Sequence, residues 1–211
     1  MTQPWIKICG ITQNKDADYA AQLGVNALGF VFYSKSPRSI SSKVLPKIIE
    51  NLKGSVSIVA LFVDPTKDEV SEVLDSGLID LIQFHGNESE EFCSSFDTPY
   101  MKALHIKDQF LPLSVFDKYS SARYLLLDTF SRKVSGGTGK TFDWSIARDA
   151  IEKTNREIII AGGLNPTNVE YVVKAISPFG VDVSSGVESA PGTKDMTKLD
   201  RFVREARSVR S

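Results

Sequence analysis

Eight short apolar runs, spread along the whole chain, constrain its fold more than any other feature of the sequence. Most are four to seven residues long and rich in Val, Ile, Leu or Phe. Most are also nearly continuous rather than alternating, which is typical of strands buried on both faces. The runs are WIKIC (5–9), ALGFVF (27–32), SIVALFV (57–63), LIQF (81–84), YMKALH (100–105), YLLLD (124–128), EIIIA (157–161) and GVDVS (180–184).

A helical pattern follows each run. Some of these patterns carry clear boundary signals: Thr66 is a candidate cap, and Asn165 followed by Pro166 predicts a helix start at 165. Strict strand–helix alternation predicts an α/β fold with a parallel sheet, and eight repeats favour a closed (β/α)8 TIM barrel over an open sheet. Because no linker interrupts the pattern, we expect residues 1–211 to form a single domain. The predicted helices are 14–23, 41–51, 66–76, 89–96, 109–119, 143–154, 165–176 and 195–209.

Composition narrows the function classes. The formal net charge is −1, which gives no general attraction to nucleic acid or to an anionic membrane. The chain has two cysteines and no run of 18 apolar residues, so we expect neither a disulfide framework nor a membrane span. The N-terminal residues do not resemble a signal peptide. These features predict a cytoplasmic protein without nucleic-acid or membrane partners.

In a TIM barrel the active site lies at the carboxyl ends of the strands. Cys9 ends the first predicted strand and Asp128 ends the sixth. Cys9 is either a small core residue or a thiolate that acts as base or nucleophile. Asp128 is either a helix cap or ion-pair partner, or a general acid or base whose pKa the barrel end raises.

The ends of the seventh and eighth strands predict a phosphate site. Gly162 and Gly163 precede the predicted helix at 165, and Ser184, Ser185 and Gly186 follow the eighth strand. Backbone amides in such loops approach phosphate closely, and a helix N-terminus favours an anion. Loops after strands seven and eight are the usual phosphate site of this fold. We therefore expect a phosphorylated small molecule as ligand.

Two further residues lie at this end of the predicted barrel. Arg38 lies in the loop after the second strand, where its guanidinium either binds a carboxylate or is a solvated surface group. His85 follows the fourth strand, with Gln83 on that strand. His85 either contacts the ligand or is hydrogen-bonded to the barrel rim.

The stretch SGGTGKT (135–141) resembles a nucleotide-binding P-loop, yet the P-loop pattern requires glycine where Val134 stands. The stretch belongs instead to a long loop after Asp128. Long glycine-rich loops beside an active site are candidate lids, so Gly136, Gly137 and Gly139 are interpreted as hinges.

A non-catalytic phosphate-binding barrel and a related sugar-phosphate isomerase remain alternatives to the assignment that follows.

Taken together, the strand ends resemble phosphoribosylanthranilate isomerase, an enzyme family of tryptophan biosynthesis. The segments that carry the resemblance span residues 7–188, nearly the whole chain. They are KICGIT, GFVFYSKSPRSIS, IQFHGNE, LLLDTF, GGTGKTFDW, AGGLNPTNV and GVDVSSGVE.

The resemblance implies an Amadori rearrangement of an N-linked aldose phosphate to a 1-amino-1-deoxyketose phosphate. It implies Asp128 as the general acid that opens the sugar ring and Cys9 as the general base at C2. Arg38 would bind the anthranilate carboxylate, and the Gly163 and Ser185 loops would bind the phosphate. No metal or other cofactor is expected, and both a monomer and a homodimer are compatible with the sequence.

Overall fold

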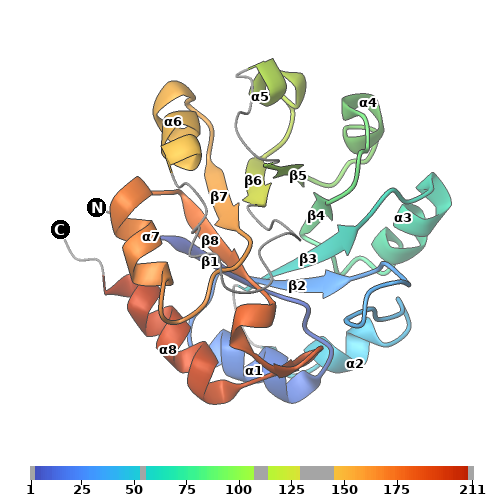
Figure 1. Ribbon diagram of the computed structural model, residues 1–211. Coiled ribbons are helices and arrows are strands. Elements are labelled where there is room, and N and C mark those ends of the chain that lie inside the picture. Colours follow the sequence, from blue (N-terminus) through green and yellow to red (C-terminus); the bar gives the residue numbers. More distant parts are fainter. Residues whose placement is uncertain (1–2, 53–55, 107–113, 129–144, 209–211) are drawn as a thin grey trace.

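Eight parallel strands close into a barrel in sequence order, with β8 pairing back onto β1 (Figure 1). The computed structural model describes residues 3–52, 56–106, 114–128 and 145–208. The predicted TIM barrel is confirmed, and four strands have the predicted bounds. The strands are β1 Trp5–Cys9, β2 Ala27–Val31, β3 Ser57–Phe62, β4 Leu81–Phe84, β5 Tyr100–His105, β6 Tyr124–Asp128, β7 Ile158–Ala161 and β8 Gly180–Val183.

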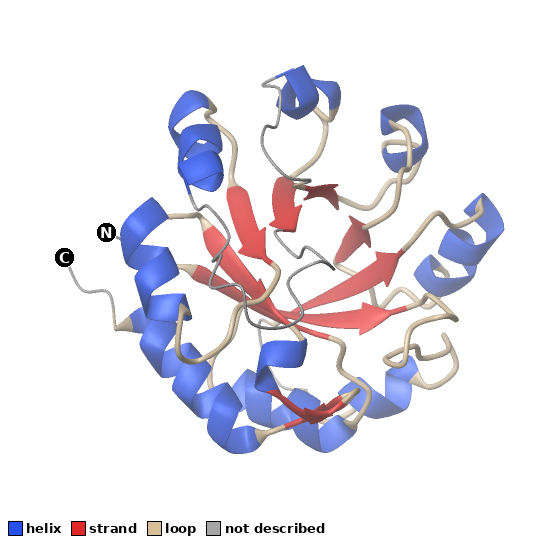
Figure 2. Ribbon diagram, viewed as in Figure 1, coloured by secondary structure: helices blue, strands red, loops and turns tan. Residues whose placement is uncertain are grey.

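Helices surround the strands, as Figure 2 shows. Each lies in a segment with a predicted helical pattern, but most are shorter than predicted. A short helix η1 (Ser185–Val187) and a small hairpin of β9 (Glu188–Ala190) and β10 (Thr193–Lys194) follow β8, and neither was predicted. The surrounding helices are α1 Asn14–Gln22, α2 Leu45–Ile49, α3 Lys67–Leu74, α4 Glu90–Cys93, α5 Ser114–Lys118, α6 Ser145–Lys153, α7 Val169–Ile176 and α8 Met196–Arg207.

Helix α3 shows how local sequence fixes an element. The Thr66 hydroxyl accepts a hydrogen bond from the Glu69 amide, and the Glu69 carboxylate accepts one from the Thr66 amide. This capping box satisfies amides that the first helical turn leaves without partners. Gly77 then adopts a positive φ of 66° just beyond the helix, a conformation that glycine reaches without steric cost.

The predicted start of α7 is wrong. Asn165 does not cap the helix, which begins only at Val169. The Asn165 side chain instead accepts from the Thr167 amide at 2.8 Å, and the Asn168 side chain accepts from the Asn165 amide at 2.8 Å. The two asparagines therefore stabilise a turn, a local use of Asn that competes with helix formation.

Buried side chains form two apolar layers, one between strands and helices and one inside the barrel. Along β1, Ile6 and Ile8 pack in the outer layer. Alternation along a strand therefore turns Lys7 and Cys9 into the barrel. The inner layer consists of Ala27, Val59, Leu81, Met101, Ala103, Leu126, Ile159 and Ala161, and a separate small cluster consists of Cys9, Val31 and Leu61.

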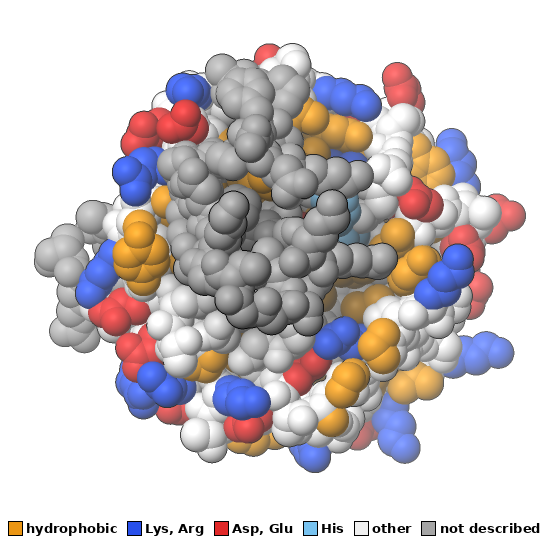
Figure 3. All heavy atoms as spheres, viewed as in Figure 1, with side chains coloured by type: hydrophobic (Ala, Val, Ile, Leu, Met, Phe, Trp, Pro, Cys, Tyr) orange, Lys and Arg blue, Asp and Glu red, His pale blue; other side chains and the backbone are white. Residues whose placement is uncertain are grey.

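Charged side chains of both signs are interspersed around the periphery of the face seen in Figure 3. This mixture agrees with the net charge of −1. Among the described residues, no helix has the length and apolar character needed to cross a bilayer.

Candidate active site

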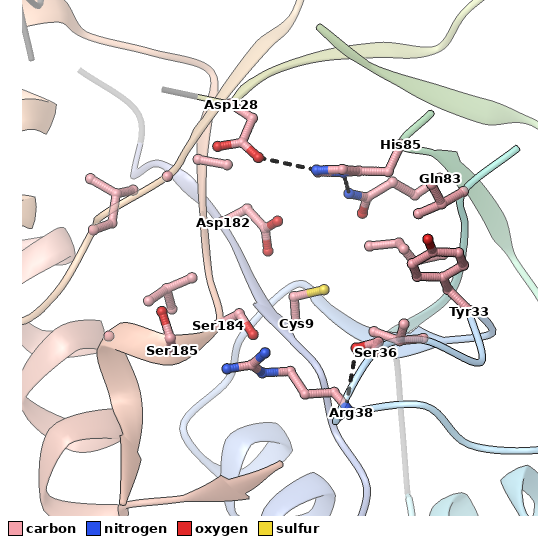
Figure 4. Close-up of a pocket in the computed structure, with 18 of the residues that line it drawn as sticks. Cys9, Tyr33, Ser36, Arg38, Gln83, His85, Asp128, Asp182, Ser184 and Ser185 are labelled. Atoms are coloured by element: carbon pink, nitrogen blue, oxygen red, sulfur yellow. Dashed lines mark hydrogen bonds and ion pairs between the residues drawn. The ribbon is translucent and has the colours of Figure 1, made fainter. Parts of the chain in front are cut away.

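A cavity of about 530 Å³ lies at the carboxyl ends of the barrel strands. Figure 4 shows side chains from opposite sides of the barrel pointing into it. The structure brings all the predicted site residues together around this cavity. They are Cys9, Arg38, His85, Asp128, Gly162, Gly163, Ser184, Ser185 and Gly186.

Cys9 is 6% exposed at the end of β1, and its sulfur points toward the centre of the pocket (Figure 4). Burial raises the pKa of the Cys9 thiol above its ordinary value, and the hydrogen-bonded Lys7 ammonium opposes that rise. Gly29 on β2 makes room for both groups, because a Cβ there would lie 2.9 Å from the sulfur and 3.0 Å from Lys7 Nζ. A thiol in this position can serve as a base once it is deprotonated.

Lys7 is fully buried inside the barrel, and its Nζ lies 3.0 Å from Asp182 Oδ1. Burial alone would favour the neutral amine, but the Asp182 carboxylate and Cys9 raise the pKa of Lys7 above its ordinary value. Lys7 is therefore an ammonium at neutral pH. It places a positive charge beneath the sulfur of Cys9, and its ion pair with Asp182 keeps that charge from being left uncompensated in the barrel interior.

Asp128 ends β6, and its side chain is 17% exposed. Its Oδ2 lies 3.1 Å from His85 Nε2, and His85 Nδ1 lies 2.9 Å from the Gln83 side-chain nitrogen. Both His85 and Asp128 line the cavity, so the histidine contacts the carboxyl group and faces the ligand space at once. A chain of hydrogen-bonding side chains thus runs from the barrel wall to Asp128.

Arg38 is not a solvated surface group. It donates through Nε and Nη2 to the two carboxylate oxygens of Glu188, at 2.8 and 2.6 Å. This side-on pair uses the Nε–Nη2 edge of the guanidinium. The other edge, formed by Nη1 and the second hydrogen of Nη2, has no hydrogen bond to a described side chain. A planar guanidinium offers a second two-pronged face for a carboxylate there.

Glu188 is the centre of a buried charge network. Lys194 Nζ lies 2.9 Å from Glu188 Oε1 and donates to the carbonyl of Cys9 at 2.6 Å. Burial opposes ionisation of Glu188, but hydrogen bonds from Arg38 and Lys194 hold its pKa below the usual range. The β9–β10 hairpin thereby ties the Arg38 loop to the end of β1.

Gly10 lets Arg38 lie over the end of β1. Its φ is 75°, and a Cβ at this position would lie 2.5 Å from Arg38 Cδ and 3.0 Å from Ser184 Oγ. Only glycine meets both demands, the backbone conformation and the close approach.

The loops after β7 and β8 lie against each other. A Cβ on Gly186 would overlap the backbone carbonyl of Leu164, so the two loops touch at this glycine. Gly162 and Gly163 adopt positive φ angles of 88° and 68°. One part of the predicted phosphate site is wrong, because α7 begins only at Val169 and its N-terminus does not directly follow the glycines. The candidate donors for an anion are therefore loop amides rather than a helix end that adjoins Gly163.

The lid predicted for SGGTGKT (135–141) lies outside the described residues, as does the start predicted for the helix at Asp143.

A family model for N-(5'phosphoribosyl)anthranilate (PRA) isomerase matches residues 6–205. The chain belongs to the PRA isomerase family.

Relatives and solved structures support this membership over nearly the full length. The chain is 46% identical over 204 residues to a PRA isomerase from Geotalea uraniireducens, covering 97% of this chain and 98% of the relative. It is 42% identical over 199 residues to one from Legionella pneumophila strain Paris, covering 94% and 95%. The crystal structure of the Thermotoga maritima PRA isomerase has a TM-score of 0.85 and 35% identity, covering 98% of this chain and 100% of that one.

One PRA isomerase structure similar to this chain contains a ligand. It is a complex with reduced 1-(O-carboxyphenylamino)-1-deoxyribulose 5-phosphate, at a TM-score of 0.81 and 33% identity, and covers 98% of this chain and all of the other.

Three charged residues at or beside the cavity were not predicted from the sequence. They are Asp182, Glu188 and Lys194. Asp182 pairs with Lys7 across 175 residues, and Glu188 pairs with Arg38 across 150. One signal was available for the first pair. Lys7 and Asp182 each interrupt an apolar strand at an inward position, and a buried charge of that kind requires a partner.

Proposed function

We propose that this chain catalyses the Amadori rearrangement of N-(5-phosphoribosyl)anthranilate to 1-(2-carboxyphenylamino)-1-deoxyribulose 5-phosphate in tryptophan biosynthesis. One observation carries the proposal: a carboxyl group on β6 and a thiol on β1 face one cavity beside two glycine- and serine-rich loops and an arginine. This substrate has a phosphate for the loops, a carboxylate for the arginine and a sugar for the acid and base. A cytoplasmic location follows from the biosynthetic role and the free thiol of Cys9.

The first step opens the sugar ring. Asp128 donates its proton to the ring oxygen while the C1–O bond breaks, and the anthranilate nitrogen lone pair forms a C=N bond to C1. The products are a Schiff-base cation and a hydroxyl on the former ring carbon. General acid catalysis of this kind contributes roughly 10²–10⁴-fold.

Asp128 must carry a proton before this step, and its neighbours permit that state. When the Gln83 amide oxygen faces His85, it accepts a hydrogen bond from Nδ1–H of the neutral ring. His85 Nε2 then has a lone pair that accepts a hydrogen bond from a protonated Asp128. In the orientation observed, the Gln83 side-chain nitrogen faces His85, and the Gln83 oxygen is buried without a described hydrogen-bond partner. Exchanging the amide oxygen and nitrogen gives that oxygen a partner in His85 Nδ1–H.

The second step moves the proton at sugar C2. The Cys9 thiolate takes that proton, and the C–H electron pair forms a C1–C2 double bond as the Schiff-base cation is neutralised. The enolamine then takes a proton at C1 and loses its enol proton, which gives the ketone. The Lys7 ammonium favours the thiolate against the effect of burial.

The remaining groups bind the substrate. The Nη1–Nη2 edge of Arg38 faces the anthranilate carboxylate, with the guanidinium oriented by Glu188. Amides and hydroxyls around Gly163 and Ser185 hold the phosphate. His85 lines the cavity and fixes the position of Asp128.

The test is loss of phosphoribosylanthranilate fluorescence on addition of the purified protein. Turnover supports the proposal. Binding without turnover would instead support a non-catalytic phosphate-binding barrel. Activity confined to the histidine-pathway aminoaldose phosphate would support a related sugar-phosphate isomerase.

A further inference from the structure

The two histidines of the chain meet at one edge of the barrel. His85 follows β4, His105 ends β5 and Asp128 ends the next strand, β6. Asp128 Oδ2 lies 3.1 Å from His85 Nε2 and 3.8 Å from His105 Nδ1. One ligand atom from each of the three residues falls within 4.8 Å of the others. Two imidazoles and one carboxylate therefore converge on a small volume beside the cavity.

Hydrogen bonding fixes which nitrogen of His105 faces this volume. Its Nε2 lies 2.9 Å from the backbone carbonyl of His85, and a carbonyl only accepts hydrogen bonds. Nε2 therefore carries the proton, and in the neutral ring Nδ1 presents a lone pair toward Asp128. This is the state in which an imidazole binds a metal ion.

His85 reaches the same state through Gln83. When the Gln83 amide turns its oxygen to His85, that oxygen accepts a hydrogen bond from Nδ1–H and leaves a lone pair on Nε2. The Gln83 oxygen is buried and without a hydrogen-bond partner in the described structure, so this reversal removes an unsatisfied group. A second polar group bound to the far nitrogen is the usual support of a metal-bound histidine.

We infer that His85, His105 and Asp128 form a binding site for a divalent transition-metal ion such as Zn²⁺, and that the bound ion inhibits the enzyme. Two imidazole nitrogens and a carboxylate oxygen match the donor preference of Zn²⁺, Ni²⁺ and Cu²⁺ rather than that of Mg²⁺ or Ca²⁺. Inhibition rests on the proposed function, because the ion occupies the carboxylate that must donate a proton. Metal binding itself does not rest on it.

The required movement is small. Tetrahedral Zn²⁺ with bonds of 2.0–2.1 Å places its ligand atoms about 3.3 Å apart. The two separations that involve Asp128 Oδ2, 3.1 and 3.8 Å, bracket that spacing, and the two histidine nitrogens lie within 4.8 Å of each other. The His105 side chain is 42% exposed, so its ring has room to turn toward the other two ligands.

Co²⁺ is the spectroscopic probe for this site, and Zn²⁺ is the competitor. The protein is prepared without a polyhistidine tag, so that the only imidazoles are those of His85 and His105. We expect a visible Co²⁺ spectrum of a nitrogen and oxygen site, without the charge-transfer band of a Co²⁺–thiolate bond, and its loss when Zn²⁺ is added. A thiolate band would place the ion on Cys9 or Cys93 and overturn the assignment, as would the absence of any Co²⁺ or Zn²⁺ binding by titration calorimetry.

His105→Asn removes one ligand, and Asn87→Ala is the matched control. Asn87 is exposed on the same rim but supplies no ligand atom to the cluster. His105→Asn should weaken Zn²⁺ binding by more than about tenfold and raise the inhibitory Zn²⁺ concentration by the same factor. Asn87→Ala should change neither. Equal Zn²⁺ affinity in His105→Asn and the unchanged protein would refute the site. If the protein lacks isomerase activity, the Co²⁺ and Zn²⁺ titrations still decide whether the ion binds.

Discussion

Glu188 holds the guanidinium of Arg38 by two hydrogen bonds, of 2.8 Å from Nε and 2.6 Å from Nη2. The same carboxylate binds Lys194, which in turn binds the carbonyl of Cys9. Glu188 thus joins the group proposed for substrate binding to the strand that carries the proposed base. Replacing Glu188 tests whether the orientation of Arg38 matters for substrate binding.

Glu188→Gln should raise KM by about tenfold or more, which corresponds to about 1.4 kcal/mol of lost binding, and should lower kcat less. An amide supplies one acceptor oxygen where the carboxylate supplied two, so the guanidinium loses its fixed direction. Steady-state kinetics separates the two constants. Glu170→Gln is the control, because it breaks an exposed pair with Lys174 that solvent and salt screen. An unchanged KM in Glu188→Gln would show that Arg38 does not depend on Glu188.

Cys9→Ala and Asp128→Asn should each reduce kcat by about 10²–10⁴-fold, as expected when a general base or acid is removed. Asp128→Asn is isosteric and Cys9→Ala removes a single heavy atom, so circular dichroism should show an intact fold. The two variants are assayed under the same conditions by fluorescence loss. Near-normal turnover in both would disprove the proposed acid and base.

In Arg38→Met we expect weaker binding of a product analogue that contains anthranilate.

The sequence was sufficient to predict the barrel and the positions of Cys9 and Asp128 at the ends of their strands, because a strand and its last residue are local features. Ion pairs between residues far apart in the sequence could not be predicted from local features. Glu188 lies 150 residues from Arg38, and its role depends on a hairpin whose path the local pattern does not indicate. The start of α7 was mispredicted for the opposite reason. Asn165 and Asn168 both have local hydrogen-bond partners, and the turn they stabilise prevailed over the cap signal.

The ionisation of Cys9 depends on both its burial and Lys7. Burial raises its pKa and Lys7 lowers it, so Lys7→Met should raise the pKa of Cys9 further. The acidic limb of the kcat/KM profile should therefore move to higher pH, because less thiolate is present at any given pH. Thiolate absorbance during a pH titration measures the shift directly. Cys93 does not interfere below strongly alkaline pH, because burial raises its pKa to about 12, and the difference from Cys9→Ser isolates the Cys9 signal.

Lys7→Met also leaves Asp182 buried without its partner, at a cost of about 3–5 kcal/mol in the free energy of unfolding. The double variant Lys7→Met with Asp182→Leu should recover much of that stability, since apolar residues of similar volume replace the pair. A change in the Cys9 pKa in the stable double variant would show that the electrostatic effect of the Lys7–Asp182 pair is separate from any unfolding. If the Cys9 pKa stayed at its original value in both variants, Lys7 would be a structural residue alone.

Gly10→Ala tests the space that Arg38 occupies. Alanine at a φ of 75° costs about 1–2 kcal/mol of stability, and its Cβ would also press on Arg38 Cδ, 2.5 Å away. Gly77→Ala is a matched control, because Gly77 has a φ of 66° and nothing lies within 4 Å of the added Cβ. Both variants should lower the melting temperature, but only Gly10→Ala should raise KM. Equal KM values in the two variants would mean that the position of Arg38 does not limit binding.

Gly186→Ala tests the contact between the two proposed phosphate loops. The added Cβ would overlap the carbonyl of Leu164, and since backbone cannot turn aside as a side chain can, the loops must separate. Gly163→Ala lies on the same site but meets nothing within 4 Å, so it incurs only the cost of its φ of 68°. Inhibition by inorganic phosphate reports on the site without the rest of the substrate. We expect Gly186→Ala to raise the inhibition constant for phosphate more than Gly163→Ala does, because separated loops no longer direct their amides at one anion. The reverse order would indicate that the phosphate site depends on the conformation at Gly163 rather than on contact between the loops.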